Sequence, residues 1–222
     1  CSSDLFGMVG ISAPIEALRD RLATVANLDM TVLLRGETGT GKELAANAIH
    51  SASDRRDERM LAVNLGALES SVIASELFGH VRGAFTGAAD ARRGYFRECD
   101  RGTLFLDEVG EAPGEVQRSL LRVLETKEVV PVGADRPVKT NVRVIAATDA
   151  DLESGIQERD FRAPLFHRLA EYEVRLPAPD FRRGLCNGTE TFGLIPPCAR
   201  RAQAPQHRLG RQAFQRRERI RL

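Results

Sequence analysis

Long apolar runs are missing from this 222-residue chain: no stretch of 18 consecutive apolar residues occurs, which excludes a helix that spans a membrane. The first thirty residues also lack the basic-then-apolar order of a signal peptide. Close cysteine pairs are missing too, because none of the four cysteines forms a C-x-x-C motif, and this argues against a zinc module or a disulfide framework. We therefore expect a cytoplasmic protein without a membrane partner.

Acidic residues are scarce toward the C-terminal end. Residues 181–222 contain ten arginines, no lysine and two acidic residues, a net charge of +8, although the whole chain carries only +1. The first 180 residues therefore carry −7. An acidic body joined to a basic tail has two interpretations: the tail is an arm that binds nucleic acid, or it is a segment unrelated to the preceding domain.

With 42% hydrophobic residues, the chain is long enough for one good-sized domain that needs no disulfides. Short apolar runs alternate with segments of helical spacing. The apolar runs predict strands at 31–35, 60–64, 103–106, 142–147 and 172–176. The segments of helical spacing predict helices at 14–27, 43–50, 70–78, 114–126 and 161–169. A hairpin is predicted at 129–132 and 138–141. Such alternation predicts an α/β fold with a mostly parallel, five-stranded sheet covered on both faces.

A glycine-rich loop follows the first predicted strand and opens a helix. It matches the pattern G-x-x-x-x-G-K with Gly36, Glu37, Thr38, Gly39, Thr40, Gly41 and Lys42. Glycines let such a loop turn its amides toward phosphate oxygens beside the positive end of the helix, and Lys42 adds a charge for the β- and γ-phosphates. The next residue, usually a magnesium-binding Ser or Thr, is Glu43 here. The simpler interpretation is a helix-capping loop without a ligand.

A second motif, Gly102–Glu108, is an apolar strand that ends in two carboxylates. In a P-loop fold this strand lies beside the glycine-rich loop, so that Asp107 can hold Mg²⁺ and Glu108 can polarise an attacking water. Alone, the segment is better explained as a strand with an acidic turn. Together with the loop it indicates an NTPase, although neither motif tells what hydrolysis is used for.

Between these motifs lies Glu76–Ala88, in which ELFGH is followed shortly by the hexapeptide GAFTGA. This segment resembles the signature of sigma-54-dependent transcriptional activators, the bacterial enhancer-binding proteins of the AAA+ superfamily. GETGTGKE is similar to that family's GESGTGKE, Glu43 included, and the resemblance covers Leu5–Pro177. It implies a three-layer P-loop NTPase (AAA+) domain that binds ATP and Mg²⁺, forms a homo-oligomeric ring, expected to be a hexamer, and acts on the sigma-54 factor of RNA polymerase.

The hexapeptide consists of Gly83, Ala84, Phe85, Thr86, Gly87 and Ala88. Small residues flank one aromatic and one hydroxyl, which is poor material for a helix or a core, and an exposed Phe85 is costly unless a partner covers it. We therefore expect a projecting loop tip. The resemblance implies that this tip engages sigma-54 and moves with the nucleotide state; the alternative is a glycine-rich turn with Phe85 tucked inward.

Further roles follow from the resemblance, position by position. Asn64, near the end of the second predicted strand, is implied to hold the catalytic glutamate and to relay the nucleotide state, although an Asn there could also form a turn. Thr148 matches the family's sensor motif VIAATN, but Asp149 stands where the family has Asn. A carboxylate near the γ-phosphate would repel it unless it is turned away or bound to a metal.

Phe161–Leu169 resembles the family's FREDLYYRL. Arg162 and Arg168 match the arginines that are taken to reach the nucleotide of the neighbouring subunit, where a guanidinium stabilises charge on the transferred phosphoryl group. A surface arginine pair on an amphipathic helix is the alternative. Pro164 replaces an acidic residue and is tolerated if it lies in the first helical turn. His167 has no His or Cys partner at suitable spacing and is interpreted as a packing or surface residue.

After Leu176-Pro177 the family pattern ends. The family continues into a helical lid and a DNA-binding helix-turn-helix, whereas residues 181–222 show no periodicity and contain only two β-branched aliphatic residues. We therefore divide the chain into an ATPase domain, 1–177, and a basic tail, 178–222, which we expect to be disordered. The tail is interpreted as the product of a frameshift or truncated gene, as a nucleic-acid arm or as a divergent lid. Site-specific DNA binding is not supported.

The sequence thus predicts the ATPase domain of a sigma-54-dependent activator, in which hydrolysis remodels the closed promoter complex through the GAFTGA loop. Without the lid, nucleotide affinity and ring assembly should both suffer. The alternative is a remnant that folds and binds nucleotide or sigma-54 without turnover. An AAA+ chaperone or helicase-like motor is disfavoured by the GAFTGA loop.

Overall fold

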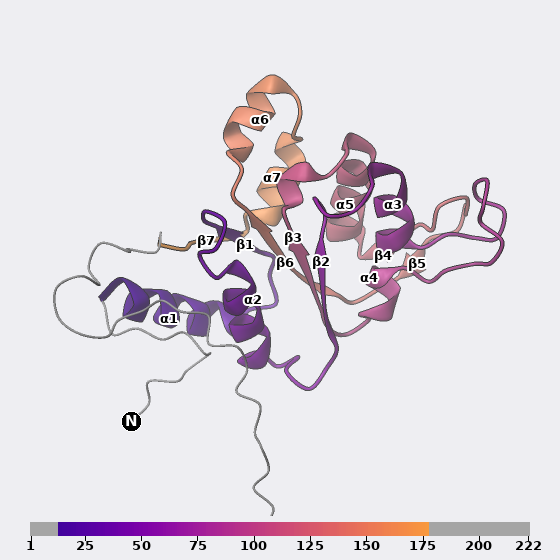
Figure 1. Cartoon of the computed structure of the whole chain (residues 1–222). Coiled ribbons are helices and arrows are strands. Elements are labelled where there is room, and N and C mark those ends of the chain that lie inside the picture. Colours follow the sequence, from indigo (N-terminus) through magenta and orange to yellow (C-terminus); the bar gives the residue numbers. More distant parts are fainter. Residues whose placement is uncertain (1–12, 178–222) are drawn as a thin grey trace, which may run out of the picture. The chain divides into compact units, whose positions relative to one another are not determined.

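A computed structural model describes residues 13–177, which form an α/β domain (Figure 1). The helices are α1 (Ala13–Ala26), α2 (Lys42–Ser51), α3 (Ser70–Phe78), α4 (Tyr95–Glu98), α5 (Gly114–Thr126), α6 (Leu152–Glu158) and α7 (Ala163–Leu169), with a 3₁₀ turn, η2, at Val109–Glu111. The strands are β1 (Val32–Arg35), β2 (Met60–Asn64), β3 (Thr103–Asp107), β4 (Glu128–Val129), β5 (Val138–Lys139), β6 (Arg143–Thr148) and β7 (Tyr172–Arg175).

Five strands form one sheet in the order β2-β3-β6-β1-β7, and every pairing within it is parallel. The strands β4 and β5 form a separate antiparallel pair. Because parallel strands point the same way, the five carboxyl ends meet at one edge of the sheet, which is where open α/β sheets bind their ligands. The predicted fold class, α/β with a five-stranded parallel sheet, is confirmed.

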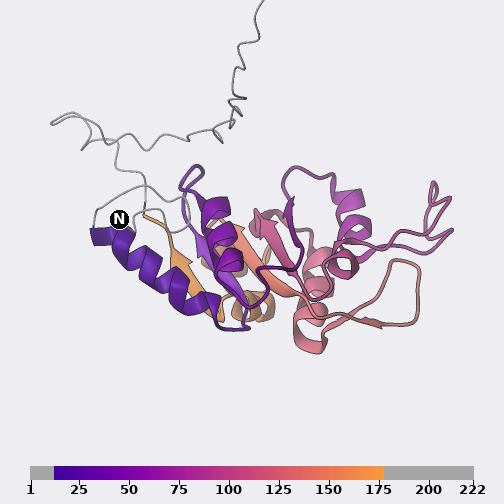
Figure 2. The same cartoon turned by 90° about the horizontal axis from the view of Figure 1, so that it is seen from below.

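Side chains of the central strands alternate between two cores, because successive residues of a strand point to opposite faces. In β3, Leu104 and Leu106 join a core with α3, α5 and α7, whereas Phe105 joins a core with α1 and α2. The strands β1 and β6 divide their side chains in the same way. Burial on both faces explains the unbroken apolar runs in the sequence. Figure 2 shows α1, in indigo, beside the orange strand β7.

The hairpin is shorter than the predicted pair 129–132 and 138–141, since only Glu128–Val129 and Val138–Lys139 form strands. Pro131 has no amide hydrogen to donate to a partner strand. Val132 pairs elsewhere: its amide donates to Gly79 O at 2.8 Å, and its carbonyl accepts from Val81 N at 3.1 Å. The loop between β4 and β5 is therefore joined to the segment that carries GAFTGA.

The helices α1 and α2 differ from the predicted ranges 14–27 and 43–50 by one residue at each end, and larger differences occur at α7 and in three short elements. Helix α7 begins at Ala163 rather than at 161, with Arg162 as its N-cap and Pro164 in the first turn, where proline is tolerated. The elements α4, η2 and α6 were not predicted, because each buries a single side chain and so shows no periodicity. A capping signal marks α6, since the Asp151 side chain accepts from Ser154 N.

No helix within residues 13–177 combines the length and the hydropathy that a membrane span requires. The predicted tail, 178–222, lies outside the described residues. Its disorder and the absence of a lid therefore stay predictions.

The buried imidazole of His50 is expected to make the fold sensitive to mild acid. On α2, the residue is 8% exposed, and Nδ1 lies 3.0 Å from the Thr103 hydroxyl of β3. Burial lowers the pKa of His50 below its usual value, and the positive charge of Arg143 acts in the same direction. Below about pH 6.5 the unfolded chain therefore binds a proton that the folded chain resists. We expect the free energy of unfolding to fall as the pH is lowered through about 6.5.

Urea unfolding at about pH 7.5 and about pH 5.5 measures this effect. His50→Gln keeps a polar partner for Thr103 but cannot titrate, so its loss of stability between the two pH values should be smaller. Equal losses in the two proteins would contradict the role of His50.

Candidate active site

Polar residues lie at the carboxyl ends of four strands, at the same edge of the sheet. Asn64 ends β2, Asp107 ends β3, Thr148 ends β6, and the glycine-rich loop follows Arg35 at the end of β1. Asn64 is paired with Asp107 across β2 and β3, and Arg35 with Thr148 across β1 and β6. The sheet therefore brings the predicted phosphate loop, the two carboxylates and the sensor threonine to one edge.

The glycine-rich loop has the geometry of a phosphate-binding turn. Gly39 and Gly41 have φ of 84° and 86°, a region that residues with side chains rarely adopt. Lys42 opens α2 and is 9% exposed, and its ammonium donates to Gly36 O at 2.8 Å and to Glu37 O at 3.3 Å. A turned backbone, a helix N-terminus and a cation form the arrangement that binds phosphate groups.

Asp107 is held in place by two neighbours. Its Oδ1 accepts from the Glu108 amide at 3.1 Å, and its Oδ2 accepts from the Asn64 side-chain amide at 3.3 Å. Asn64 Oδ1 in turn accepts from Ala67 N at 3.0 Å. The structure thus bonds Asn64 to Asp107, whereas the resemblance implied that it holds Glu108. Through Ala67, this bond links the end of β3 to the segment that leads into α3.

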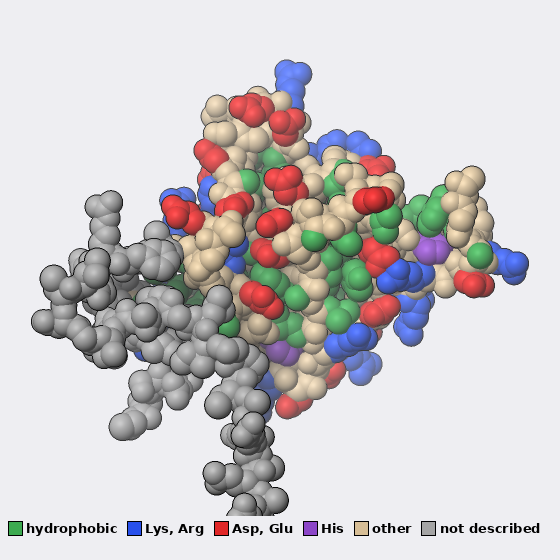
Figure 3. All heavy atoms as spheres, viewed as in Figure 1, with side chains coloured by type: hydrophobic (Ala, Val, Ile, Leu, Met, Phe, Trp, Pro, Cys, Tyr) green, Lys and Arg blue, Asp and Glu red, His purple; other side chains and the backbone are tan. Residues whose placement is uncertain are grey.

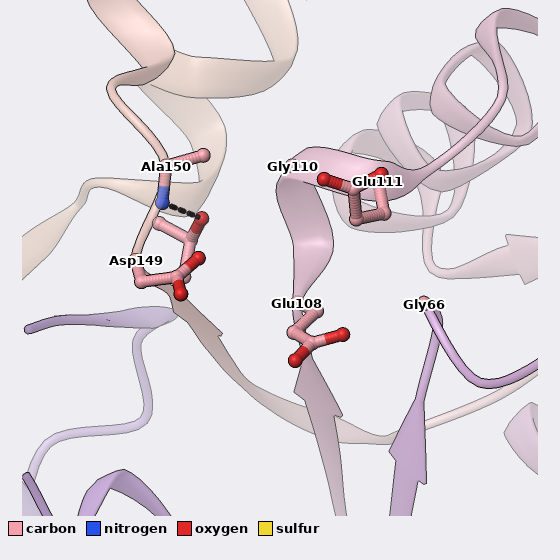
Figure 4. Close-up of a pocket in the computed structure, with 7 residues that line it drawn as sticks. Gly66, Glu108, Gly110, Glu111, Asp149 and Ala150 are labelled. Carbon is pink, nitrogen blue, oxygen red and sulfur yellow. Dashed lines mark hydrogen bonds between the residues drawn. The ribbon is translucent and has the colours of Figure 1, made fainter. Parts of the chain in front are cut away.

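Glu108 has an unusual backbone conformation, with φ 53° and ψ 47°. This left-handed region is uncommon for residues with a side chain, and such outliers cluster at functional sites. The turn places the carboxylate against Gly66, whose missing side chain leaves room for it: a methyl group on Gly66 would overlap with Glu108 Oε2. Figure 4 shows Glu108 between Gly66 and Asp149.

The end of β6 forms the other side of the site. Thr148 is 1% exposed, and its hydroxyl accepts from Ala150 N at 3.0 Å, the dashed line in Figure 4. Its carbonyl accepts from Gly36 N at 3.3 Å, which joins β6 to the phosphate loop. The Thr38 hydroxyl donates to Asp149 Oδ2 at 2.8 Å. The aspartate that replaces the family's asparagine is therefore directed at the phosphate loop.

An open pocket of about 250 Å³ lies between these strand ends. It is lined by Gly66, Glu108, Gly110, Glu111, Thr148, Asp149 and Ala150. Three of these residues are acidic, and Figure 3 shows acidic side chains gathered on this face between α6 and α2. A phosphate ligand would need cations besides Lys42 to enter such a surface.

The donor set fits a magnesium ion that binds together with phosphate. Each Asp107 oxygen accepts a hydrogen bond, one from Asn64 and one from the Glu108 amide, which leaves further lone pairs. Mg²⁺ prefers one or two carboxylates combined with phosphate oxygens and water. Within residues 13–177, no group of three or more His, Cys, Asp or Glu side chains could hold a metal by itself. Oxygens of a phosphate ligand would therefore have to complete the coordination by Asp107.

The GAFTGA segment lies on a loop that projects from the domain, next to the loop that joins β4 and β5 (Figures 1 and 2). His80 and Arg92 close the base of this loop, because each backbone amide donates to the other's carbonyl, at 3.0 and 2.9 Å. Gly79 and Gly94 pack backbone against backbone at the same place, where a side chain on either would overlap with the opposite strand of the loop.

The tip of this loop exposes its aromatic residue. Gly83 N donates to Ala88 O at 2.9 Å, and Ala88 N donates to Phe85 O at 3.0 Å, so that the tip is closed on itself. Phe85 is 47% exposed, and its ring lies edge-on to His80 with 5.1 Å between ring centroids. Figure 3 shows hydrophobic side chains beside a histidine on this projection. Phe85 thus lies outside both cores, as a projecting tip requires.

Arg162 and Arg168 lie apart from the pocket between the strand ends. Both are exposed. Arg168 forms ion pairs with Glu125 at 3.9 Å and with Glu171 at 3.5 Å, and the Arg162 amide donates to Gln117 Oε1 at 3.0 Å. Their positions on the surface of α7 leave both guanidinium groups accessible to another molecule. His167 is exposed on the same helix, as predicted.

Three residues around these sites were not singled out from the sequence. Gly66 and Gln117 belong to no recognised motif, and their residue types occur anywhere. His80 stands within ELFGH but received no role. Only the contacts described above single them out.

Comparisons with known proteins identify the family of this chain. Residues 8–175 match the Sigma-54 interaction domain family. The chain is 47% identical over 170 residues to the anaerobic nitric oxide reductase transcription regulator NorR of Vibrio vulnificus (strain CMCP6), which covers 77% of this chain and 33% of that protein. It is 48% identical over 177 residues to the Nif-specific regulatory protein of Bradyrhizobium diazoefficiens, which covers 80% and 30%.

Among solved structures, NtrX from Brucella abortus in complex with ATP is similar, with a TM-score of 0.72 and 36% identity over 78% of this chain and 37% of that one. The chain therefore spans about a third of the curated relatives that it matches. The parallel sheet, the glycine-rich loop and the two carboxylates form a P-loop NTPase fold of the AAA+ type. Because the family match covers most of the chain, this chain belongs to the Sigma-54 interaction domain family.

Proposed function

We propose that this domain binds and hydrolyses ATP within a homo-oligomeric ring, and that hydrolysis drives the GAFTGA loop against sigma-54 to remodel the closed complex of RNA polymerase in the cytoplasm. The observation that carries the proposal is the meeting of Lys42, Asp107 and Glu108 at one sheet edge. The exposed Phe85 supports the second half of it. The ATP complex of NtrX and the family match add support from relatives.

Nucleotide binding is assigned to Gly36–Glu43. The phosphates would lie on the amides of this loop, and Lys42 would leave the carbonyls of Gly36 and Glu37 to pair with the β- and γ-phosphates. Asp107 would hold magnesium, which would supply positive charge to the phosphate oxygens. Thr148 would contact the γ-phosphate region from β6. The Asp149 carboxylate, bonded to Thr38, would repel the γ-phosphate unless it turns away or binds a metal, so no sensor role is proposed for it.

Hydrolysis is assigned to Glu108 and to a neighbouring subunit. The Glu108 carboxylate lines the pocket, where it would orient the attacking water and accept its proton. Arg162 and Arg168, exposed on α7, would stabilise the charge on the transferred phosphoryl group of the next subunit. Turnover would then require assembly, because each site is completed by its neighbour.

A chain of contacts runs from the phosphate site toward the projecting loop. Asp107 binds Asn64, Asn64 binds the Ala67 amide, and the segment after Ala67 leads into α3. Helix α3 ends directly before Gly79 and the base of the loop. A shift of Asp107 on hydrolysis would therefore move α3 and the loop together, which is the basis for the proposed lever.

Gly66→Ala should separate binding from hydrolysis. The added methyl group overlaps with the Glu108 carboxylate and would displace it, whereas Gly66 lies at an exposed position and not at the phosphate loop. A misplacement of about 1 Å costs roughly 100-fold in rate. We therefore expect a loss of phosphate release of that order, with an unchanged dissociation constant for a fluorescent ATP analogue. Wild-type turnover would show that the carboxylate works from another position.

A capture experiment tests the proposed action on sigma-54. The wild-type chain, Thr86→Ala in the loop tip and Thr126→Ala on α5 are each mixed with purified sigma-54 in the presence of ADP and aluminium fluoride. We expect the wild type and Thr126→Ala to capture sigma-54 and Thr86→Ala to lose it. Equal capture by all three proteins would remove the loop from the contact.

The alternative, a remnant without turnover, is tested by phosphate release at increasing protein concentration. The proposed ring predicts that release per subunit rises with concentration as subunits assemble. A flat signal equal to that of Glu108→Gln would identify the remnant instead.

A further inference from the structure

Helix α5 buries a polar side chain that contacts two other segments. Gln117 is 1% exposed. Its Nε2 donates to Ala112 O at 2.8 Å and to Asp160 O at 2.9 Å, and its Oε1 accepts from Arg162 N at 3.0 Å. Both amide hydrogens and the carbonyl oxygen are thus used in bonds to backbone groups outside α5.

The first of these segments belongs to the active site. Ala112 ends the turn that starts at Glu108: Glu111 N donates to Glu108 O at 3.0 Å, and Ala112 N donates to Val109 O at 3.2 Å. A carbonyl held by Gln117 is therefore only four residues from the proposed catalytic carboxylate and connected to it by a hydrogen-bonded turn.

The second segment carries an arginine of the proposed trans site. Asp160 and Arg162 flank the buried Phe161 directly before α7. On one side this segment borders an open hollow of about 410 Å³ that Gln117 and Arg162 both line. The bonds from Gln117 and the packing of Phe161 help to hold the backbone of Arg162. Asp160 N and Phe161 N also donate to Gly155 O, at 2.9 and 3.0 Å, and Phe166 N donates to Arg162 O at 3.1 Å. Among these bonds, those from Gln117 are the ones that connect the segment to the turn after Glu108.

Glutamine is suited to bridging these two segments. Two carbonyls need two donors and one amide needs an acceptor, and among side chains only an amide supplies both. Leaving buried partners unsatisfied is unfavourable, so the bridge through Gln117 opposes a change in the separation of the two segments.

We propose that Gln117 is a positioning residue: it holds the Arg162 backbone in register with the turn that follows Glu108, and so aims the Arg162 guanidinium at the nucleotide of the adjacent subunit. The proposal rests on the proposed trans role of Arg162. The turn after Glu108 keeps its own bonds, from Glu111 N to Glu108 O and from Ala112 N to Val109 O, when Gln117 is replaced. The proposal therefore predicts that damage at Gln117 appears in the neighbour's active site and not in the nucleotide pocket of the subunit that carries the substitution.

Subunit mixing distinguishes these two locations. Gln117→Met keeps the length of the side chain but loses all three bonds, and we expect kcat to fall roughly 10- to 100-fold with an unchanged dissociation constant for a fluorescent ATP analogue. Mixing this variant with inactive Glu108→Gln should restore hydrolysis, because Glu108→Gln subunits present an intact Arg162 to sites that still contain Glu108. Gln117→Asn, which keeps the amide on a shorter side chain, should show the same pattern, and it decides the question if Gln117→Met does not fold.

Two control variants distinguish a specific effect of Gln117 from a general loss of activity. Ser119→Ala, on the same helix, should retain wild-type kcat. Arg162→Ala mixed with Glu108→Gln tests the trans role itself and should also recover. Recovery with Arg162→Ala but not with either Gln117 variant would overturn the positioning role and leave the proposed function intact. Failure of the Arg162→Ala mixture would overturn both.

Discussion

Glu108→Gln is expected to abolish ATP hydrolysis while ATP binding is retained. Glutamine keeps the size of the side chain that lies against Gly66, but it cannot accept a proton from water. Loss of a general base typically costs roughly 10²–10⁴-fold in rate. The phosphate loop and Lys42 are unchanged, so affinity for ATP should persist. Phosphate release at saturating ATP and titration with a fluorescent ATP analogue measure the two quantities on the same protein.

A matched carboxylate tests whether the effect is specific. Glu115→Gln removes one negative charge from the exposed first turn of α5 and should hydrolyse ATP like the wild type. Equal turnover of Glu108→Gln and Glu115→Gln would exclude Glu108 as the base. Loss of binding in Glu108→Gln would show instead that its carboxylate organises the pocket before any chemistry.

Arg162→Ala is expected to produce the second large loss. An arginine supplied in trans typically accelerates phosphoryl transfer by roughly 10³–10⁵-fold. Arg162 is exposed, and its bonds to Gln117 and Phe166 are made by its backbone, so the change to alanine should leave the fold and the affinity of each subunit for ATP intact. Phosphate release per subunit should then stay near background at every protein concentration, whereas the wild-type value rises with concentration.

Two further variants define the chemistry of this effect. Arg162→Lys keeps the charge but loses the planar guanidinium, and it should stay strongly impaired. Arg159→Asn changes an exposed arginine three residues earlier, at a left-handed backbone position that asparagine accepts, and should retain activity. Full activity of Arg162→Ala would show that this side chain belongs only to the surface.

The local pattern of apolar and polar residues was sufficient to predict most of the helices and strands. The helices at 70–78 and 114–126 and the strand at 60–64 agree with the structure at both ends, because amphipathic spacing or an apolar run fills each of them. Prediction was less complete where a neighbour decided the outcome: Val132 bonds to Gly79 and Val81 rather than extending the hairpin. The short helices α4 and α6 were not predicted, because each buries a single side chain and therefore shows no helical periodicity.

The candidate site could likewise be predicted only in part from the sequence. The glycine-rich loop and the Asp107-Glu108 pair were visible, because their chemistry needs particular residue types at close spacing. The partner of Asn64 was not predictable, since a strand-end amide can bond to either neighbouring carboxylate and only the parallel register sets it opposite Asp107.

By itself, the sequence determined the order of strands and helices, the phosphate-binding motif and the membership in a family of activator domains, because these depend on residues adjacent along the chain. The tertiary structure alone decided which side chains act together: Asn64 with Asp107, Gln117 with Arg162, and Thr38 with Asp149, which are 43, 45 and 111 residues apart. Asparagine, glutamine and threonine occur throughout proteins, so their roles arise only when the sheet and its helices bring distant segments to within hydrogen-bonding distance.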